Sequence, residues 1–284
     1  VLRAEWSSAD ARWTVEALRR DDAGREETVR FTAGFLCSCA GYYRYEAGYT
    51  PEFPGREDFQ GRIVHPQHWP EDLDTAGKRI VVIGSGATAI TLLPSLAKTA
   101  GHVTMLQRSP TWMVSRPEHD PVASLLRRIL PAKAAFRVAR WLNTAFQQYA
   151  YRMARRRPER ARRFLLDQVR QHLGRDYDVA THFTPRYDPW EQRLCLVPDA
   201  DLFLAIREGR ASVETDTIER FTEKGVRLAS GRELPADVIV TATGLTLELL
   251  GGVQVAVDGR PVDFSRALTY KGVMFSDVPN LISV

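Results

Sequence analysis

A strand, a glycine-rich turn, a helix and a second strand follow one another between Arg79 and Pro110, and this stretch constrains the fold more than any other. Ile80 to Ile83 is a β-branched apolar run of the kind that lies buried in a parallel sheet. A second apolar strand is expected at His102 to Leu106. The turn between them has the pattern Gly-x-Gly-x-x-Ala, formed by Gly84, Ser85, Gly86, Ala87, Thr88 and Ala89. This β-α-β unit predicts an α/β fold with a Rossmann-like domain.

The small residues of the turn are those that a dinucleotide requires. Gly84 permits a tight turn, Gly86 lets the backbone approach a pyrophosphate, and Ala89 keeps the helix close to the strand. The first N–H groups of the helix then point at the phosphates. We therefore predict that the turn binds a dinucleotide cofactor.

The residues after the second strand discriminate between nicotinamide cofactors. An acidic residue there would accept hydrogen bonds from a ribose hydroxyl, whereas arginine can pair with a 2'-phosphate. The chain has Gln107, Arg108 and Ser109 at this place. We predict an NADP site in which Arg108 holds the phosphate with help from Ser109; the alternative is a solvated surface arginine.

The composition is that of a globular protein, with 44% hydrophobic residues in a chain of 284. No apolar run has the length of a membrane span and no signal peptide is recognisable, so we expect a cytoplasmic protein. Three cysteines are too few for a disulfide framework. Cys37 and Cys39 alternate along an apolar strand, which favours a place in the core over metal binding, and no metal site is predicted.

The net charge of +4 hides a strongly basic segment. Residues 121–163 contain twelve Lys or Arg and one acid, Glu159, so the rest of the chain has 27 basic and 34 acidic residues. The segment is helix-like, and a solvated helical face is the first interpretation. Peripheral contact with an anionic membrane is the second. No nucleic-acid module accompanies the charge, so we predict no nucleic-acid partner.

A meander followed by an apolar strand that ends in glycine occurs twice, before Gly41 and before Gly244, which implies two dinucleotide-binding domains. The second unit has its glycine turn at Gly84, but none precedes the first, so we expect the chain to be a fragment that lacks a first dinucleotide fingerprint. We predict a partial first domain at 1–41, a linker at 42–77, a nucleotide domain at 78–235 with a helical insertion at about 112–186, and an incomplete return to the first domain at 236–284.

The linker contains the pattern Phe-x-Gly-x-x-x-His-x-x-x-Trp-Pro, in which the defined residues are Phe59, Gly61, His65, Trp69 and Pro70. It resembles the fingerprint of the Baeyer-Villiger flavoprotein monooxygenases, and with the glycine turn and the Ala242-Thr243-Gly244 strand end the resemblance covers the whole chain. The resemblance implies a two-dinucleotide-binding-domain flavoprotein in which the split domain at 1–41 and 236–284 binds FAD. A linker of this composition between cofactor domains can act as a hinge.

The resemblance also implies an activity. Family members reduce FAD with NADPH and use O2 to insert one oxygen atom into ketones or to oxidise sulfur and nitrogen centres. By its place after Trp190, Arg193 matches the arginine that stabilises negative charge near the flavin, which an always-charged guanidinium can do. Gln192 stands where many members have a lysine that contacts NADP, and Val1 falls where the adenine end of FAD is expected.

Three functions remain open at this stage. The first is an NADPH- and FAD-dependent monooxygenase for ketones or thiocarbonyl and other sulfur compounds. The second is a related nitrogen- or sulfur-oxygenating flavin monooxygenase, which the Trp-Pro ending disfavours. The third is a non-catalytic NADP-binding fragment, since the isolated chain is expected to bind FAD poorly.

Overall fold

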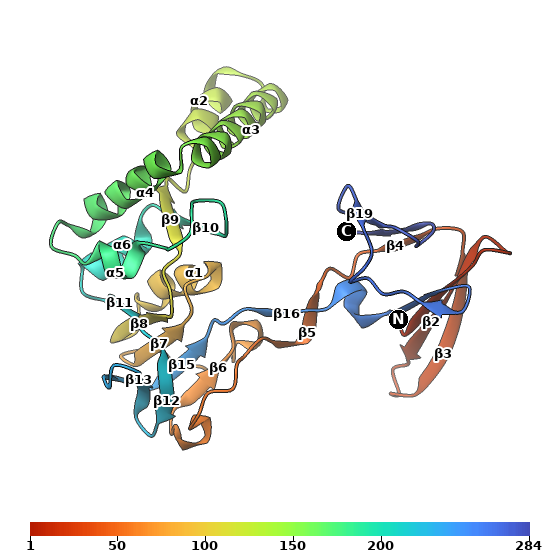
Figure 1. Ribbon diagram of the computed structural model, residues 1–284, viewed down its shortest axis with the longest axis horizontal. Coiled ribbons are helices and arrows are strands. Elements are labelled where there is room, and N and C mark those ends of the chain that lie inside the picture. The colour runs from red at the N-terminus through yellow and green to blue at the C-terminus, as the bar shows by residue number, and fades with distance from the viewer. The chain divides into compact units, whose positions relative to one another are not determined.

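The computed structural model describes all residues from Val1 to Val284. The chain divides into two compact units, each made of its own elements (Figure 1). Unit 1 consists of Val1–Tyr49 together with Leu245–Val284, and unit 2 is the continuous stretch Thr50–Gly244. Unit 2 is thus inserted into the sequence of unit 1.

A five-stranded parallel sheet forms the centre of unit 2, in the order β11-β8-β7-β15-β6. The strands lie side by side in Figure 1. Their bounds are β6 Arg62–Val64, β7 Arg79–Ile83, β8 His102–Gln107, β11 Ala211–Thr215 and β15 Val238–Thr241. The chain leaves β7 through helix α1 (Ala87–Leu96) to β8 on one side, while β15 pairs on the other. The glycine turn therefore lies where the strand order reverses, the usual ligand site of such sheets.

Side chains alternate across β7 and bury both faces of the sheet. Ile80 and Val82 belong to a core shared with α1 and with helix α6 (Asp201–Arg207). Val81 and Ile83 belong to a second core, shared with the antiparallel sheet of β12 (Ile218–Thr222), β13 (Gly225–Leu228) and β14 (Glu233–Pro235). The predicted β-α-β unit and the second meander are confirmed, and the sheet is covered on both faces as parallel sheets require.

A mainly helical segment separates β8 from β11 in the sequence. It begins with β9 (Trp112–Arg116), which pairs in parallel with β10 (Leu194–Pro198). Four helices lie between these strands: α2 Pro121–Ile129, α3 Ala132–Arg156, α4 Pro158–Leu173 and α5 Val179–Phe183. Asp120 caps α2, since its carboxylate accepts from the N–H groups of Val122 and Ala123. Helices α2 and α3 lie side by side in Figure 1, beyond β9.

Unit 1 is a β structure around a core that includes Trp6 and Trp13. Its larger sheet has the order β18-β17-β1-β2-β3, and three two-stranded pairs complete it: β21 with β4, β16 with β5, and β19 with β20. The strands are β1 Arg3–Ser7, β2 Arg12–Arg20, β3 Glu26–Ala33, β4 Leu36–Ser38, β5 Tyr43–Gly48, β16 Leu245–Leu247, β17 Gln254–Val257, β18 Arg260–Pro261, β19 Thr269–Tyr270, β20 Met274–Phe275 and β21 Leu281–Ser283. The 3₁₀ helices of the chain are Arg56–Asp58 and Pro66–His68 in unit 2 and Leu249–Gly252 in unit 1.

The core position predicted for Cys37 and Cys39 is wrong, because both side chains are exposed. Strand β4 is only three residues long and pairs on one side alone, with β21. Cys37 and Cys39 line a cavity of unit 1 instead of a packed interior, so their face of the chain stays open. The two sulfur atoms lie 3.9 Å apart, and this proximity raises the pKa of the Cys37 thiol.

Candidate functional site

The glycine turn at the end of β7 has the shape predicted for it. Gly84 has φ +130°, and a Cβ atom there would lie 2.4 Å from the carbonyl oxygen of Ala242 at the end of β15. Its N–H donates to the carbonyl of Leu106 at 2.8 Å. Both the conformation and the close packing therefore require glycine at this position.

The protein itself does not require glycine at position 86, where a missing side chain leaves space in front of the helix. Gly86 has a φ of −77°, which any residue adopts, and a Cβ atom there would meet nothing within 4 Å. It precedes α1, whose first turn contains no acidic residue, so the positive end of the helix faces open space uncompensated. Thr88 is exposed in this turn and Ala89 is fully buried against the sheet. The residues present thus fit a pyrophosphate, with the backbone N–H groups as donors.

Ser85 connects the glycine turn to the segment after β8. Its hydroxyl donates to the carbonyl of Ser109 at 3.2 Å and lies 3.0 Å from the hydroxyl of Thr111. The structure therefore brings the backbone of Ser109 to the glycine turn. Thr111 was not predicted; its signal was its place two residues beyond Ser109, immediately before β9.

Arg108 follows β8 with an exposed side chain that takes part in no ion pair of the structure. A cation without a partner beside an open helix N-terminus is what a 2'-phosphate would need. The neighbouring Gln107 differs from the prediction. It is 2% exposed, and its amide nitrogen donates to the carbonyl of His182 and to the hydroxyl of Thr215. With these bonds made, its side chain holds α5 to the sheet instead of facing a nucleotide.

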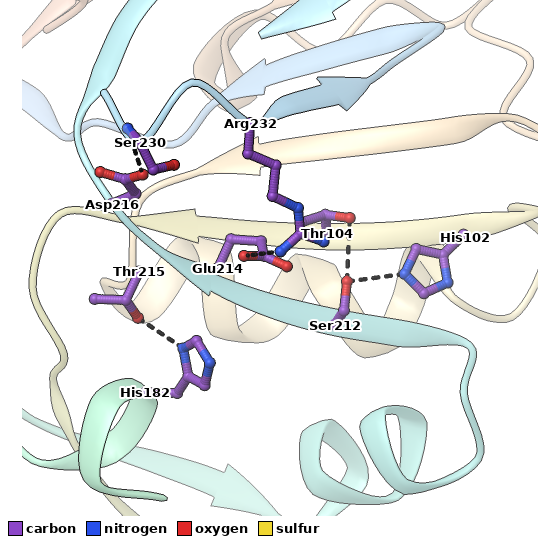
Figure 2. Close-up of polar contacts among 9 residues, drawn as sticks. All are labelled: His102, Thr104, His182, Ser212, Glu214, Thr215, Asp216, Ser230 and Arg232. Carbon is purple, nitrogen blue, oxygen red and sulfur yellow. Dashed lines mark hydrogen bonds and ion pairs between the residues drawn. The ribbon is translucent and has the colours of Figure 1, made fainter. Parts of the chain in front are cut away.

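The polar side chains around β11 form the edge of this sheet (Figure 2). His182 Nδ1 lies 2.9 Å from the hydroxyl of Thr215, and burial lowers the pKa of His182 more than nearby carboxylates raise it. Figure 2 also shows Ser212 in contact with His102 and Thr104, Arg232 paired with Glu214, and Asp216 accepting from the N–H of Ser230. Each contact joins β11, or Asp216 directly after it, to another part of unit 2, which indicates a structural role.

The first half of the Phe-x-Gly-x-x-x-His-x-x-x-Trp-Pro fingerprint lies against the parallel sheet. Phe59 is buried and makes an edge contact with Phe221 of β12. A Cβ atom on Gly61 would lie 2.4 Å from the carbonyl oxygen of Asp237 and 2.5 Å from the ring of Phe59, so only glycine fits. The residues that follow form β6, which pairs with β15. The segment expected to be a linker thus supplies a strand of unit 2.

The second half of the fingerprint begins at His65, whose Nδ1 accepts from the N–H of Gln67 and caps the short 3₁₀ helix. Its Nε2 lies 3.0 Å from the carbonyl oxygen of Gly244. Trp69 ends this helix with 36% of its surface exposed, and Pro70 follows, half-buried. Through this contact His65 connects the fingerprint to Gly244, which follows the end of β15.

Arg193 and Gln192 are exposed at the start of β10. The loop before them is fixed by Trp112, whose indole donates to the carbonyl of Tyr187, and by Asp188, which pairs with Arg162 of α4 at 2.6 Å. Leu194 is paired with Trp112, so Arg193 stands one residue before this pair just as Thr111 does. Arg193 thus immediately precedes β10 as Thr111, whose hydroxyl contacts Ser85 of the glycine turn, immediately precedes β9.

Val1 belongs to unit 1, where it lines a cavity of about 350 Å³ together with Ala4, Leu36, Leu250 and other mostly apolar residues. This cavity could take a flat apolar group such as part of an adenine. Unit 1 contains no α-helix in the structure, so its residues offer no helix N-terminus to a pyrophosphate. The described residues therefore fit the nicotinamide dinucleotide in unit 2 and only a part of a flavin dinucleotide in unit 1.

None of the helices combines the length and the hydrophobicity that a membrane span requires.

The sequence matches the model of the flavin-binding monooxygenase-like family over residues 2–174. It is 52% identical over 282 residues to the FAD-containing monooxygenase EthA of Mycobacterium tuberculosis, covering 99% of this chain and 57% of that protein. It is 48% identical over 285 residues to the probable FAD-binding monooxygenase AlmA of Acinetobacter baylyi, covering 100% of this chain and 56% of that protein. The chain thus spans little more than half the length of these relatives.

Solved structures share the fold over the whole chain. An open crystal structure of cyclohexanone monooxygenase has a TM-score of 0.72 at 20% identity, covering 100% of this chain and 62% of that one. A steroid monooxygenase bound to NADP has a TM-score of 0.69 at 20% identity, with coverage of 100% and 60%. The likeness confirms the predicted fold class, a two-dinucleotide-binding-domain α/β flavoprotein fold. With more than half of its residues matched by the family model, the chain belongs to the flavin-binding monooxygenase-like family.

Proposed function

We propose that the chain functions in an NADPH- and FAD-dependent monooxygenase that acts on a small molecule. One oxygen atom of O2 would enter a ketone, or oxidise a thiocarbonyl or other sulfur centre, while the other leaves as water with electrons from NADPH. In this proposal residues 78–235 bind NADP, and the parts at 1–41 and 236–284 contribute to a FAD-binding domain. The names of the relatives and family membership support the chemistry, and the residues of unit 2 support the cofactor.

The observation that carries the proposal is the open N-terminus of α1 beside Arg108. Gly86 leaves space where a side chain would stand, and Gly84 is held tightly against Ala242, so the turn is fixed while the space before the helix stays free. An exposed guanidinium without an ion pair follows the adjacent strand. A partly exposed turn of this shape, followed along the sheet by a cation without an ion pair, suits a dinucleotide that carries an extra phosphate.

Each residue has a stated task in this proposal. The N–H groups after Gly86 bind the pyrophosphate, Arg108 and Ser109 bind the 2'-phosphate, and Arg193 places a permanent positive charge near the reacting groups. Bound NADPH supplies the hydride that reduces the flavin. Because Gln192 is uncharged, it contributes at most a hydrogen bond to the nicotinamide cofactor.

Cofactor choice tests the NADP site directly. Arg108→Gln should weaken NADPH binding by about tenfold or more, since a charge-assisted bond to phosphate is lost, and should leave NADH binding unchanged. Arg175→Gln is the matched control, because Arg175 is also exposed and outside every ion pair. Isothermal titration with both nucleotides gives the result. Equal losses for NADPH and NADH would refute the assignment of Arg108.

The flavin spectrum after addition of FAD separates a catalytic chain from an NADP-binding module. Unit 1 has no helix N-terminus for a pyrophosphate, so we expect this chain to bind FAD weakly and NADPH well. A yellow protein with stoichiometric FAD would contradict this expectation. In that case ketone and amine substrates, compared by product analysis, would distinguish Baeyer-Villiger oxygenation from nitrogen or sulfur oxygenation.

The role of Arg193 requires an enzyme that turns over. In a protein that contains this chain and holds FAD, Arg193→Ala should lose oxygenation and keep reduction of the flavin by NADPH. Normal oxygenation by that variant would show that the role is wrong.

We also propose that the basic segment at 121–163 makes peripheral contact with a membrane, on the basis of its charge and helical form.

A further inference from the structure

Helices α2 and α3 turn large apolar side chains toward solvent. We call residues 121–156 the basic hairpin. On α2, Leu125 is 58% and Ile129 is 67% exposed, and with Val122 they have the spacing of one helix face. A helix of a globular protein normally buries such a stripe.

Helix α3, 25 residues long, likewise turns its large apolar side chains toward solvent. Its fully buried side chains are two alanines, Ala135 and Ala154. Its large apolar residues are instead exposed, with Trp141 at 68% and Tyr149 at 63%. Val138, Trp141, Leu142 and Tyr149 follow the spacing i, i+3, i+4 and i+11 and therefore lie along one face. Within unit 2, Phe146 of this helix lies beneath the guanidinium of Arg116 and Tyr151 contacts Trp190, but Trp141 and Tyr149 stay more than 60% exposed.

Most basic residues of this region take part in no ion pair. Of the twelve Lys and Arg between residues 121 and 163, Arg162 is paired with Asp188, and none of the other eleven takes part in an ion pair. Fourteen of the fifteen ion pairs of the structure involve basic residues outside this segment. The hairpin therefore presents uncompensated positive charge beside exposed aromatic and aliphatic groups.

We propose that the basic hairpin is a docking surface for an anionic phospholipid bilayer. Its apolar faces enter the boundary between headgroups and acyl chains, and its arginines pair with lipid phosphates. The combination favours lipid over the other occupants. A second copy would bring the same positive charge against itself, because a two-fold interface is made of one surface used twice. Nucleic-acid backbone would leave Leu125 and Ile129 without an apolar partner. This inference deepens the membrane contact proposed above and does not depend on oxygenation chemistry.

Sedimentation with vesicles tests the surface. We expect the chain to bind vesicles of phosphatidylglycerol and phosphatidylcholine in equal parts, and to bind pure phosphatidylcholine at least tenfold more weakly. Raising the salt concentration should release it, because an exposed electrostatic contact is screened at about 8 Å under physiological conditions. Equal binding to both vesicles, or binding to neither, would overturn the proposal.

Charge variants locate the contact. Neutralising Arg128, Arg137 and Arg140 to glutamine should weaken binding to the anionic vesicles by about a hundredfold, since each basic residue near such a surface contributes about fivefold. The matched control removes three exposed charges of unit 2 outside the hairpin, in Arg175→Gln, Arg207→Gln and Lys224→Gln, and should bind nearly as the parent chain does. Equal losses for both triple variants would show that only net charge matters and would refute a docking surface.

Aromatic variants test the apolar part. Trp141→Ala should weaken vesicle binding about tenfold because a large side chain loses its burial in lipid, whereas Phe31→Ala in unit 1, at 59% exposure, should have no effect. NADPH binding must be unchanged in every variant, which shows that unit 2 is folded and keeps this test separate from the cofactor assignment. A stable dimer in light scattering that Trp141→Ala dissociates, without vesicle binding, would assign the face to a second copy and overturn the proposal.

Discussion

The imidazole Nε2 of His65 lies 3.0 Å from the carbonyl oxygen of Gly244. Because Nδ1 accepts the N–H of Gln67, the proton of the neutral ring is on Nε2, which donates to this carbonyl. Gly244 is the last residue of unit 2, and the chain continues into unit 1 at Leu245. The histidine of the fingerprint thus anchors the point at which the chain passes from one unit to the other.

Removal of this anchor should loosen that point. His65→Ala should lower the free energy of unfolding by about 1 kcal/mol, the usual contribution of a hydrogen bond, and increase amide exchange around Gly244. His119→Ala, an exposed histidine for which the structure records no hydrogen bond, serves as the control. Hydrogen exchange followed by mass spectrometry gives the readout, and unchanged exchange at residues 243–247 would contradict the anchoring role.

The two glycines of the turn should respond differently to the same substitution. Gly84→Ala places a Cβ atom 2.4 Å from the carbonyl oxygen of Ala242 at a positive φ. The free energy of unfolding should therefore fall by several kcal/mol. Gly86→Ala meets no protein atom, so stability should stay within about 0.5 kcal/mol while NADPH binding falls. Thermal unfolding with and without NADPH measures both effects. Normal NADPH binding by Gly86→Ala would show that the nucleotide does not approach this turn.

Local patterns predicted much of unit 2, because its elements are specified by neighbouring residues. The apolar alternation of β7, the small residues of the turn and the second meander are all readable within short windows. Strand β6 was not predicted, since it pairs with β15 about 175 residues later and carries only three residues. Exposure of Cys37 likewise depends on what packs over the face of β4, which here is an open cavity, and no local pattern contains that information.

For Gln107 the sequence contained a signal for burial, the alternation of the strand, but the prediction followed its position after the strand instead. It continues the alternation of Val103 and Met105, whose side chains lie in the core beneath the helices, and so it points the same way. Position after a second strand suggested cofactor binding, whereas strand periodicity indicated burial. In the same alternation Arg108, one residue further, falls on the opposite face, and it is exposed.

His182 should make stability depend on pH in the mildly acidic range. Burial lowers its pKa below the ordinary value, so the unfolded chain takes up this proton at a higher pH than the folded one. The free energy of unfolding should therefore decrease as pH falls below about 6.5, the reference value for histidine. His182→Asn should show a smaller decrease between neutral pH and pH 5 in urea unfolding. His119→Asn should retain the full decrease, and an identical profile for His182→Asn would contradict this origin.

Asp237 should make the stability of the protein depend on pH in a more acidic range than His182 does. Hydrogen bonds from the side chain and the N–H of Arg79 hold the pKa of this carboxyl below its ordinary value. Its stabilisation is present above the unfolded pKa of about 3.9 and is lost as pH falls through the lower folded value. Both side chains are more than a third exposed, so Asp237→Asn should cost under about 1 kcal/mol at neutral pH. Acid unfolding should be less steep in this variant, and an unchanged acid limb would exclude the pair as a cause.

The insertion of unit 2 into the sequence of unit 1 has a consequence for biosynthesis. Strand β1 pairs in parallel with β17, with Arg3 opposite Gln254, so this sheet closes only after the whole of unit 2 has been made. Unit 2 is continuous, and its sheet is complete once β15 has left the ribosome. Domains fold as units in the order of their synthesis, and distant pairings form slowly. Until translation reaches β17 and then Leu281, Trp6 and Trp13 lack the residues that complete their core, so we expect the N-terminal segment of the nascent chain to expose apolar side chains.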